Sequence, residues 1–259
     1  MADETVTVDV EHGVALVTLN RPEARNALNG ELIAALRGAL QECGGRDYVS
    51  AVVLTGADPA FCAGLDLGYL ADRAERHAAD EDIFPEVPVP RIPKPVIGAV
   101  NGPAVTGGLE VALACDLLVA SERARFADTH TRVGIVPGWG LSVALPAAVG
   151  MRRAKEMSAT GNFVDASTAL TWGLVNHVVP HDELVPFALA LAADMVSVDQ
   201  SALNALMATY DDGADLVDRP RHDLERARYM EWQSDAEGAG ASIAERKAGI
   251  IERGRAQKG

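Results

Sequence analysis

One stretch near the middle of the chain constrains the fold more than any other. Residues 95–100, Pro-Val-Ile-Gly-Ala-Val, form a continuous apolar run typical of a buried strand. Residues 101–103, Asn-Gly-Pro, are typical of a turn. Gly107 and Gly108 then allow close backbone approaches that a side chain would block, and residues 109–115 follow a helical pattern rich in Ala and Leu. The stretch therefore predicts a buried strand, a tight glycine loop and the first turn of a helix.

This strand–loop–helix unit can place hydrogen-bond donors and a carboxylate together at the start of a helix. The first amides of a helix lack partners within it, and the helix dipole favours negative charge at that end. Gly107 places one such amide where no side chain obstructs an incoming oxygen, and Glu110 follows about one turn later. We therefore expect an oxyanion donor and a carboxylate base to face one pocket. From spacing alone, an alternative remains open in which the glycines form a packing turn and Glu110 is a favourable first-turn acid.

The remaining hydrophobic patterns predict mixed strands and helices up to about residue 180, followed by a helical region. Strands are expected at 5–19 as a hairpin, 51–55, 116–120 and 174–179. Helices are expected after an N-cap at Asn29, within 141–160 as a pair, and over 165–172. Residues 126–139 look like a loop, and the helical region should break near 211–213 and 237–240. We predict a core over residues 1–180 and a helical region over 181–259, whose apolar faces need to be covered either by a core of their own or, as an oligomerisation region, by another subunit.

Residues 71–94 differ in composition from the sequence on either side. The segment is charged over 71–82, and prolines follow at 85, 88, 90 and 93. This composition predicts a mobile flap or lid over a pocket rather than part of the core.

Charge and cysteine content narrow the class of protein. The 37 acidic and 23 basic residues give a net charge of −14, which argues against nucleic acid as the main partner. The cysteines Cys43, Cys62 and Cys115 form no metal-binding pattern and are typical of reduced thiols. We find no signal peptide and no apolar run long enough to cross a membrane. We therefore expect a cytoplasmic protein that needs neither a metal nor a membrane.

Motifs along nearly the whole chain resemble the crotonase superfamily, also called the enoyl-CoA hydratase/isomerase family. The central signature is similar at 94–102, 107–110 (Gly-Gly-Leu-Glu) and 114–116 (Ala-Cys-Asp). Two loops resemble the family's CoA-binding loops: Arg-Pro-Glu-Ala-Arg-Asn-Ala-Leu at 21–28 and Ala-Phe-Cys-Ala-Gly-Leu-Asp at 60–66. Further matches follow in the family order at 124–127, 134–138, 154–157 and 169–175. A chance resemblance of all these motifs in sequence is very improbable.

The resemblance implies an α/β fold with a crotonase-type β-β-α spiral core and a C-terminal helical trimerisation region. It further implies a homotrimer or a dimer of trimers, an acyl-CoA thioester ligand and no separate cofactor. The backbone amides of Leu65 and Gly107 would bind the thioester oxygen, which agrees with the glycine turns found above. Backbone around Ala24, Ala63 and Leu65 would hold the adenine end of CoA.

Further contacts to the substrate are expected from three side chains. Arg25, in the first loop, is expected either to reach a phosphate or to be a solvated loop charge. Asp66 ends the second loop and is included among the candidate CoA contacts. Trp139 lies between Gly138 and Gly140, where the family usually has a small residue, so its indole would either cap the acyl pocket or pack against the next helix.

The second acid/base position departs from the family pattern. Family hydratases use two glutamates that share a water, and Glu110 matches the first. The second would fall four residues after Phe126, where this chain has His130. Either His130 replaces the carboxylate as an acid/base group, because its unperturbed pKa of about 6.5 suits proton transfer, or Glu110 acts alone and His130 only lines the pocket. A third possibility is that Asp128 is the working acid.

These residues lead to a principal hypothesis and its rivals. The principal hypothesis is a hydratase that adds water across the 2,3 double bond of a 2-enoyl-CoA in fatty-acid or related acyl-CoA metabolism. One rival is an enoyl-CoA isomerase or another crotonase-type enzyme, such as a thioester hydrolase, that uses Glu110 alone. The other rival is an acyl-CoA-binding protein without catalysis, suggested by the missing second glutamate.

Overall fold

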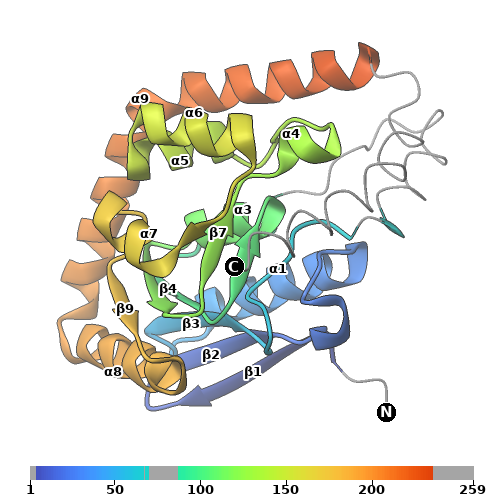
Figure 1. Ribbon diagram of the computed structural model, residues 1–259. Helices are drawn as coiled ribbons and strands as arrows, with labels where there is room; N and C mark the ends of the chain where they lie inside the picture. The colour runs from blue at the N-terminus through green and yellow to red at the C-terminus, as the bar shows by residue number, and fades with distance from the viewer. Residues whose placement is uncertain (1–3, 67, 70–86, 236–259) are drawn as a thin grey trace.

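A six-stranded sheet forms the framework of the protein (Figure 1). The structure is a computed structural model that describes residues 4–66, 68–69 and 87–235 of the 259. The first pair of strands is antiparallel, and the other neighbours are parallel. The strands lie in the order β1 (Val6–Glu11), β2 (Val14–Leu19), β3 (Ala51–Gly56), β4 (Val96–Val100), β6 (Leu117–Ser121) and β9 (His177–Val179). Every residue of β3 and β4 is buried, as expected for central parallel strands.

A second, smaller sheet stands beyond the carboxyl end of the first. It consists of β5 (Pro103–Val105), β7 (Arg125–Ala127) and β8 (Val164–Asp165). The chain passes from β4 through a short turn at 101–102 directly into β5. Because β5 and β7 are parallel neighbours, the segments that follow them leave from the same edge of the small sheet.

Helices cover both sheets. They are η1 (Pro22–Ala24), α1 (Gly30–Gly45), α3 (Gly107–Leu113), α4 (His130–Val133), α5 (Leu141–Val149), α6 (Met151–Thr160), α7 (Ala166–Trp172), η2 (His181–Glu183), α8 (Leu184–Ser197) and α9 (Gln200–Asp235). The predicted N-cap of α1 is confirmed, because Asn29 Oδ1 accepts a hydrogen bond from the Leu32 amide at 2.8 Å. Figure 1 shows α9 along one side of the molecule and across α5, with which it is in contact.

Two apolar clusters lie on opposite faces of the large sheet. On one face the buried side of α1, including Leu36 and Leu40, packs with Leu54 of β3. On the other face α8 packs through Ala188 and Ala192 against alternate residues of the central strands, which include Ile97. The alternation follows from the strand period of two. Helix α8, which begins at residue 184, therefore packs directly on the sheet of the first 180 residues.

Two predictions about secondary structure are wrong. Residues 126–139 are not simply a loop, because they contain the end of β7 and the short helix α4. The expected break at 211–213 is absent, since α9 runs continuously through Gly213. One glycine costs a helix only about 1 kcal/mol, and ion pairs of Arg91 with Asp211 and Asp215 stabilise this part of α9. The break lies instead before α9, where Asp199 Oδ1 caps the Ala202 amide at 2.7 Å.

The predicted lid is tested only at its end, because residues 71–86 lie outside the described residues. Residues 87–94 pack against the core instead of projecting from it. Val89 is buried, and Lys94 Nζ donates to the Cys43 carbonyl of α1 at 2.9 Å. Arg91 reaches Asp215 of α9 at 3.0 Å. This part of the segment therefore connects α1 to α9.

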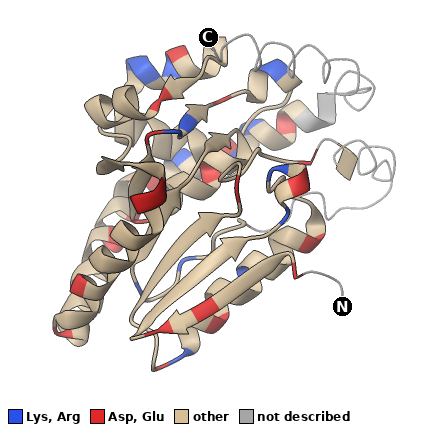
Figure 2. Cartoon of the chain, turned by 60° about the horizontal axis from the view of Figure 1, so that its bottom comes forward, with Lys and Arg blue, Asp and Glu red and all other residues tan. Residues whose placement is uncertain are grey.

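Charges are mixed over the described surface. Figure 2 shows the positions of Lys and Arg scattered among those of Asp and Glu on several elements. None of the described helices is by itself long and apolar enough to span a membrane. The helical segments 181–197 and 200–232 reach that length and apolar composition only when they are counted together, and they are bent by 109° at the break between them.

Candidate active site

Two glycine-containing loops meet above the carboxyl end of the large sheet. One follows β3 and the other follows β4, and because these strands are parallel neighbours both loops emerge at the same edge. A parallel bridge joins Cys62 to Ala104, with Cys62 N donating to the Pro103 carbonyl at 3.1 Å. The approach requires glycine at 64, where φ is +92° and a Cβ atom would lie 2.7 Å from the Val105 carbonyl oxygen.

The amides of Leu65 and Gly107 face one small region between these loops. A Cβ atom on Gly107 would lie 3.6 Å from the Leu65 nitrogen. Among the hydrogen bonds of the described residues, neither amide donates to a protein group. The two amides can therefore donate to one oxygen atom placed between them. The arrangement has the geometry of an oxyanion hole.

A strained residue fixes the start of α3. Thr106 has φ 56° and ψ −114°, which is unusual for a β-branched residue. Its amide donates to the Ala127 carbonyl of β7 at 2.8 Å, and its hydroxyl lies 2.5 Å from the hydroxyl of Thr129. These contacts tie the helix start to β7. As a result α3 begins at Gly107, two residues earlier than the helical pattern from Leu109 predicted.

Glu110 lies in the first turn of α3 and is buried. Its Oε1 accepts a hydrogen bond from the Trp139 amide at 3.0 Å, and its Oε2 lies 3.4 Å from His130 Nε2. The pairing follows from topology: Glu110 follows β5, His130 follows β7, and these strands are parallel neighbours. The two predicted acid/base residues are therefore brought together.

His130 stands between two carboxylates. Its Nδ1 lies 2.7 Å from Asp128 Oδ1, and the side chains of all three residues are at most 3% exposed. Burial lowers the pKa of His130, but Glu110 and Asp128 outweigh it and raise the pKa to about 9. Burial also acts to raise the pKa of Asp128, but the hydrogen bond from His130 and its charge bring that pKa below its ordinary value. At neutral pH the imidazole is therefore protonated and donates from both nitrogens.

The geometry separates the roles left open for Asp128 and His130. Asp128 contacts the ring nitrogen that points away from Glu110, and it also accepts the His130 amide at 3.1 Å. His130, and not Asp128, is the residue that meets Glu110. Asp128 as an anchor for the histidine was not predicted. The sequence did contain a signal for this contact, because Asp128 lies two residues before His130, a spacing typical of a local turn closed by an Asp side chain.

Trp139 lies beside the pair of amides. Its Cζ3 would be 3.1 Å from a Cβ atom on Gly107, and the residue is only 9% exposed. The indole therefore forms one wall of the region between the Gly107 amide and Glu110.

The two predicted CoA loops run side by side. Ala63 N donates to the Arg25 carbonyl at 3.0 Å, and Leu28 N donates to the Gly64 carbonyl at 2.8 Å. This pairing places Ala24 and Arg25 next to Ala63 and Leu65. The Arg25 side chain is exposed on a left-handed residue (φ 53°).

Asp66 is already engaged by protein groups. It lies 3.4 Å from an Arg21 guanidinium nitrogen and accepts the Gly68 amide at 3.0 Å. These contacts stabilise the end of the second loop.

The sequence model of the enoyl-CoA hydratase/isomerase family matches residues 9–248. The chain belongs to this family. The resemblance predicted from the motifs is therefore confirmed.

Relatives and solved structures agree with this assignment. A protein named probable enoyl-CoA hydratase from Rhizobium meliloti is 35% identical over 263 residues, covering 96% of this chain and 98% of that protein. An enoyl-CoA hydratase structure from Mycobacterium tuberculosis is 45% identical with a TM-score of 0.82, covering 89% of this chain and 99% of that one. A structure described as a monofunctional enoyl-CoA isomerase from M. smegmatis is 33% identical with a TM-score of 0.70, covering 85% and 98%. These matches confirm the predicted crotonase-type fold.

Proposed function

We propose that this family member is an enoyl-CoA hydratase that adds water across the 2,3 double bond of a 2-enoyl-CoA thioester. The observation that carries the proposal is the buried contact between Glu110 and His130 beside the amides of Leu65 and Gly107. Relatives named as hydratases, including a crotonyl-CoA hydratase from Syntrophomonas wolfei at 31% identity over 98% of this chain, support the same reaction.

The two amides stabilise the charge that forms during addition. As the nucleophile attacks C3, electron density moves from the double bond to the thioester oxygen. The amides of Leu65 and Gly107 donate to that oxygen and stabilise the enolate-like transition state. The loss of one such donor in comparable sites costs roughly 3–4 kcal/mol of activation free energy.

Glu110 and His130 divide the proton transfers between them. Glu110 takes a proton from water as the oxygen bonds to C3, and the His130 imidazolium then gives its Nε2 proton to C2. One proton has moved from water to Glu110 and one from His130 to carbon. The contact of 3.4 Å between Glu110 Oε2 and Nε2 then provides the route by which the carboxyl returns its proton to the imidazole. Asp128 holds the imidazole by its other nitrogen.

The same geometry supports one alternative reaction. A 3-enoyl-CoA isomerase moves a single proton between two carbons, and Glu110 alone is sufficient for that step. The similarity to the isomerase structure from M. smegmatis supports this alternative reaction. A non-catalytic acyl-CoA-binding protein would bind thioesters without converting either substrate.

The binding partners and assembly are also proposals. The backbone of Ala24 and Ala63 is suited to contact the adenine end of CoA, with Arg25 exposed toward solvent for a phosphate. We further propose a homotrimer or a dimer of trimers. Its support is the apolar side chains that α9 exposes, among them Leu216 (86%) and Val217 (67%).

The reaction needs no metal or separate cofactor in this proposal, because Glu110 and His130 supply the base and the acid and CoA belongs to the substrate. Dialysis against EDTA should leave the rate unchanged. A cytoplasmic location is proposed from the three cysteines, all unpaired and buried.

The proposed reaction is tested by following the loss of conjugated-thioester absorbance with crotonyl-CoA and a longer 2-enoyl-CoA. Glu110→Gln should slow the loss by roughly 100-fold or more, and Glu122→Gln, an exposed glutamate away from the site, should not slow it. Identification of the 3-hydroxyacyl-CoA product separates hydration from other reactions. Conversion of a 3-enoyl-CoA without water addition would select the isomerase, and release of free CoA thiol would select hydrolysis. Binding without any turnover would select the non-catalytic alternative.

A further inference from the structure

Glu225 is a buried carboxylate in a part of α9 where most side chains are exposed. Between residues 221 and 230 of α9, only Glu225 and Tyr229 are buried. Glu225 is 8% exposed and belongs to the region predicted to serve oligomerisation. A buried carboxylate is costly unless it is fully hydrogen-bonded, so its partners indicate what it does.

The partners of Glu225 are the first amides of α5. Its Oε1 accepts the Gly140 amide at 2.6 Å, and its Oε2 accepts the Ser142 amide at 2.7 Å. Gly140 occupies the N-cap position and has no side chain with which to cap the helix. The carboxylate of α9 therefore supplies the cap from 85 residues away.

The backbone of the capped turn is restricted by its own conformation and by its contact with α9. Gly140 has φ +95°, a conformation that favours glycine. A Cβ atom at this position would lie 3.0 Å from His222 Cε1 of α9. Helix α9 thus packs directly on the turn and holds it from two sides.

The same turn carries Trp139, the residue immediately before Gly140. The Trp139 amide donates to Glu110 Oε1 at 3.0 Å, and the indole stands against Gly107. Two adjacent amides of one turn therefore bind two carboxylates, one in the site and one on α9. The turn therefore links the carboxylate of Glu225 on α9 to the carboxylate of Glu110.

We propose that Glu225 is a positioning residue for the reaction: by holding the turn at 139–142, it keeps the Trp139 amide on Glu110 and the indole beside the oxyanion amides. The inference rests on the proposed function and deepens it. It makes α9 part of the catalytic apparatus as well as a surface for other subunits.

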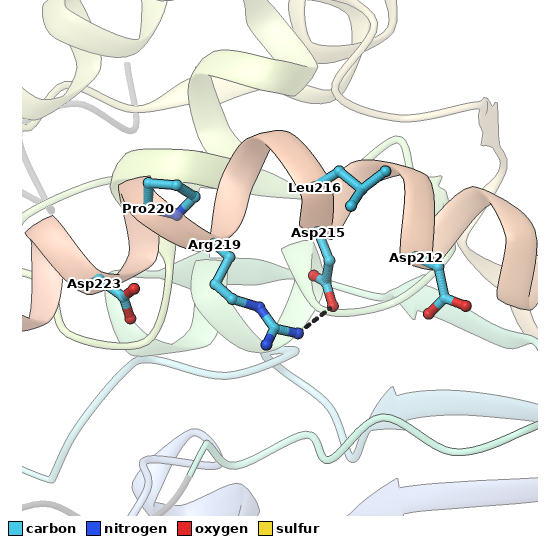
Figure 3. A pocket seen from close by; sticks show the side chains of 6 residues that line it. All are labelled: Asp212, Asp215, Leu216, Arg219, Pro220 and Asp223. Atoms are coloured by element: carbon cyan, nitrogen blue, oxygen red, sulfur yellow. Dashed lines mark ion pairs between the residues drawn. The ribbon is translucent and has the colours of Figure 1, made fainter.

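Asp223 provides a matched control on the same helix. It lines a groove along α9, together with Asp212, Asp215, Leu216, Arg219 and Pro220 (Figure 3). Its substitution by asparagine removes one negative charge from α9, as Glu225→Gln does, without touching the turn.

The first test compares steady-state kinetics of the wild type, Glu225→Gln and Asp223→Asn with crotonyl-CoA. We expect Glu225→Gln to lower kcat about tenfold or more, because misplacement of a catalytic group by about 1 Å can cost 100-fold. KM should stay within about twofold, because the substitution leaves the hydrogen bonds between the two predicted CoA loops in place. Asp223→Asn should match the wild type. An unchanged kcat in folded Glu225→Gln would overturn the proposal.

A second test separates positioning from a general loss of stability. Glu225→Gln is introduced into the Glu110→Gln variant, and the residual rate is measured. If Glu225 acts through Glu110, the second substitution should change the residual rate by less than about twofold. An equal loss in both backgrounds would show a structural effect only and would overturn the proposal.

A third measurement does not depend on activity. In a protein carrying Trp172→Phe and Trp232→Phe, Trp139 is the remaining indole. Glu225→Gln should change its fluorescence emission, and Asp223→Asn should not; identical emission in both would count against the proposal. If the wild type converts no enoyl-CoA, the proposed function fails, while this measurement still decides whether Glu225 positions the turn.

Discussion

Substitution of His130 by glutamine removes the titrating group from the centre of the Asp128–His130–Glu110 contacts and keeps a polar side chain there. Burial lowers the pKa of His130, but the two carboxylates raise it overall to about 9. The difference from the unfolded value of about 6.5 corresponds to about 3 kcal/mol of the free energy of unfolding. The substitution should therefore remove a contribution to stability that depends on pH.

The sign follows from the direction of the pKa change. The folded protein binds the proton more tightly than the unfolded chain does, so the contribution is fully present below about pH 6.5. It is lost as the pH rises through about 9. Urea denaturation of the wild type, measured from pH 6 to pH 10 at constant salt and protein concentration, should show this loss. The His130→Gln variant should lack it.

The control is His12→Gln, because the His12 side chain is 89% exposed at the surface. This variant should keep the pH dependence of the wild type. Parallel stability curves for the wild type and His130→Gln across this range would refute the assignment of a protonated His130 held between two carboxylates.

Three further substitutions test the remaining parts of the site. Asp128→Asn removes the charge at His130 Nδ1, so the alkaline limb of kcat/KM against pH should move down by about one pH unit; an unmoved limb would contradict the anchoring role. Gly107→Ala places a methyl group 3.1 Å from Trp139 Cζ3 beside the Leu65 amide, so kcat/KM with crotonyl-CoA should fall about 100-fold. A full rate would contradict the requirement for open space beside the Gly107 amide. Arg25→Ala should raise KM about threefold or more for a CoA thioester but not for the matching pantetheine thioester, which lacks the phosphates; an equal rise for both would argue against a phosphate contact.

Local sequence patterns were sufficient for most of the elements that build the core. The alternation in residues 5–19 predicts the hairpin of β1 and β2, and Asn29 with its helical apolar spacing predicts α1. Such patterns succeed because one buried face repeats at a period of two or 3.6 residues. The short strands β5 and β7 carry too few residues for a period, so the sequence could not reveal them.

The site was predicted only where its residues are close in sequence or belong to a family motif. Gly107 and Glu110 are close in sequence, and the family motifs supply Leu65 and His130. The bond between Glu225 and the turn at 140 was not predictable, because 85 residues separate its ends and neither end carries a motif. The break expected at 211–213 failed because Arg91, distant in sequence, stabilises the helix there.

The sequence by itself determined the chemical groups: an amide freed by Gly107, a carboxylate one turn later, and a histidine where the family has a second glutamate. Only the tertiary structure decided how these groups act on one another. The parallel pairing of β5 with β7 brings His130 to Glu110, with Asp128 on the other side of the ring. The three side chains are at most 3% exposed, so the charge on His130 depends mainly on its two carboxylate neighbours.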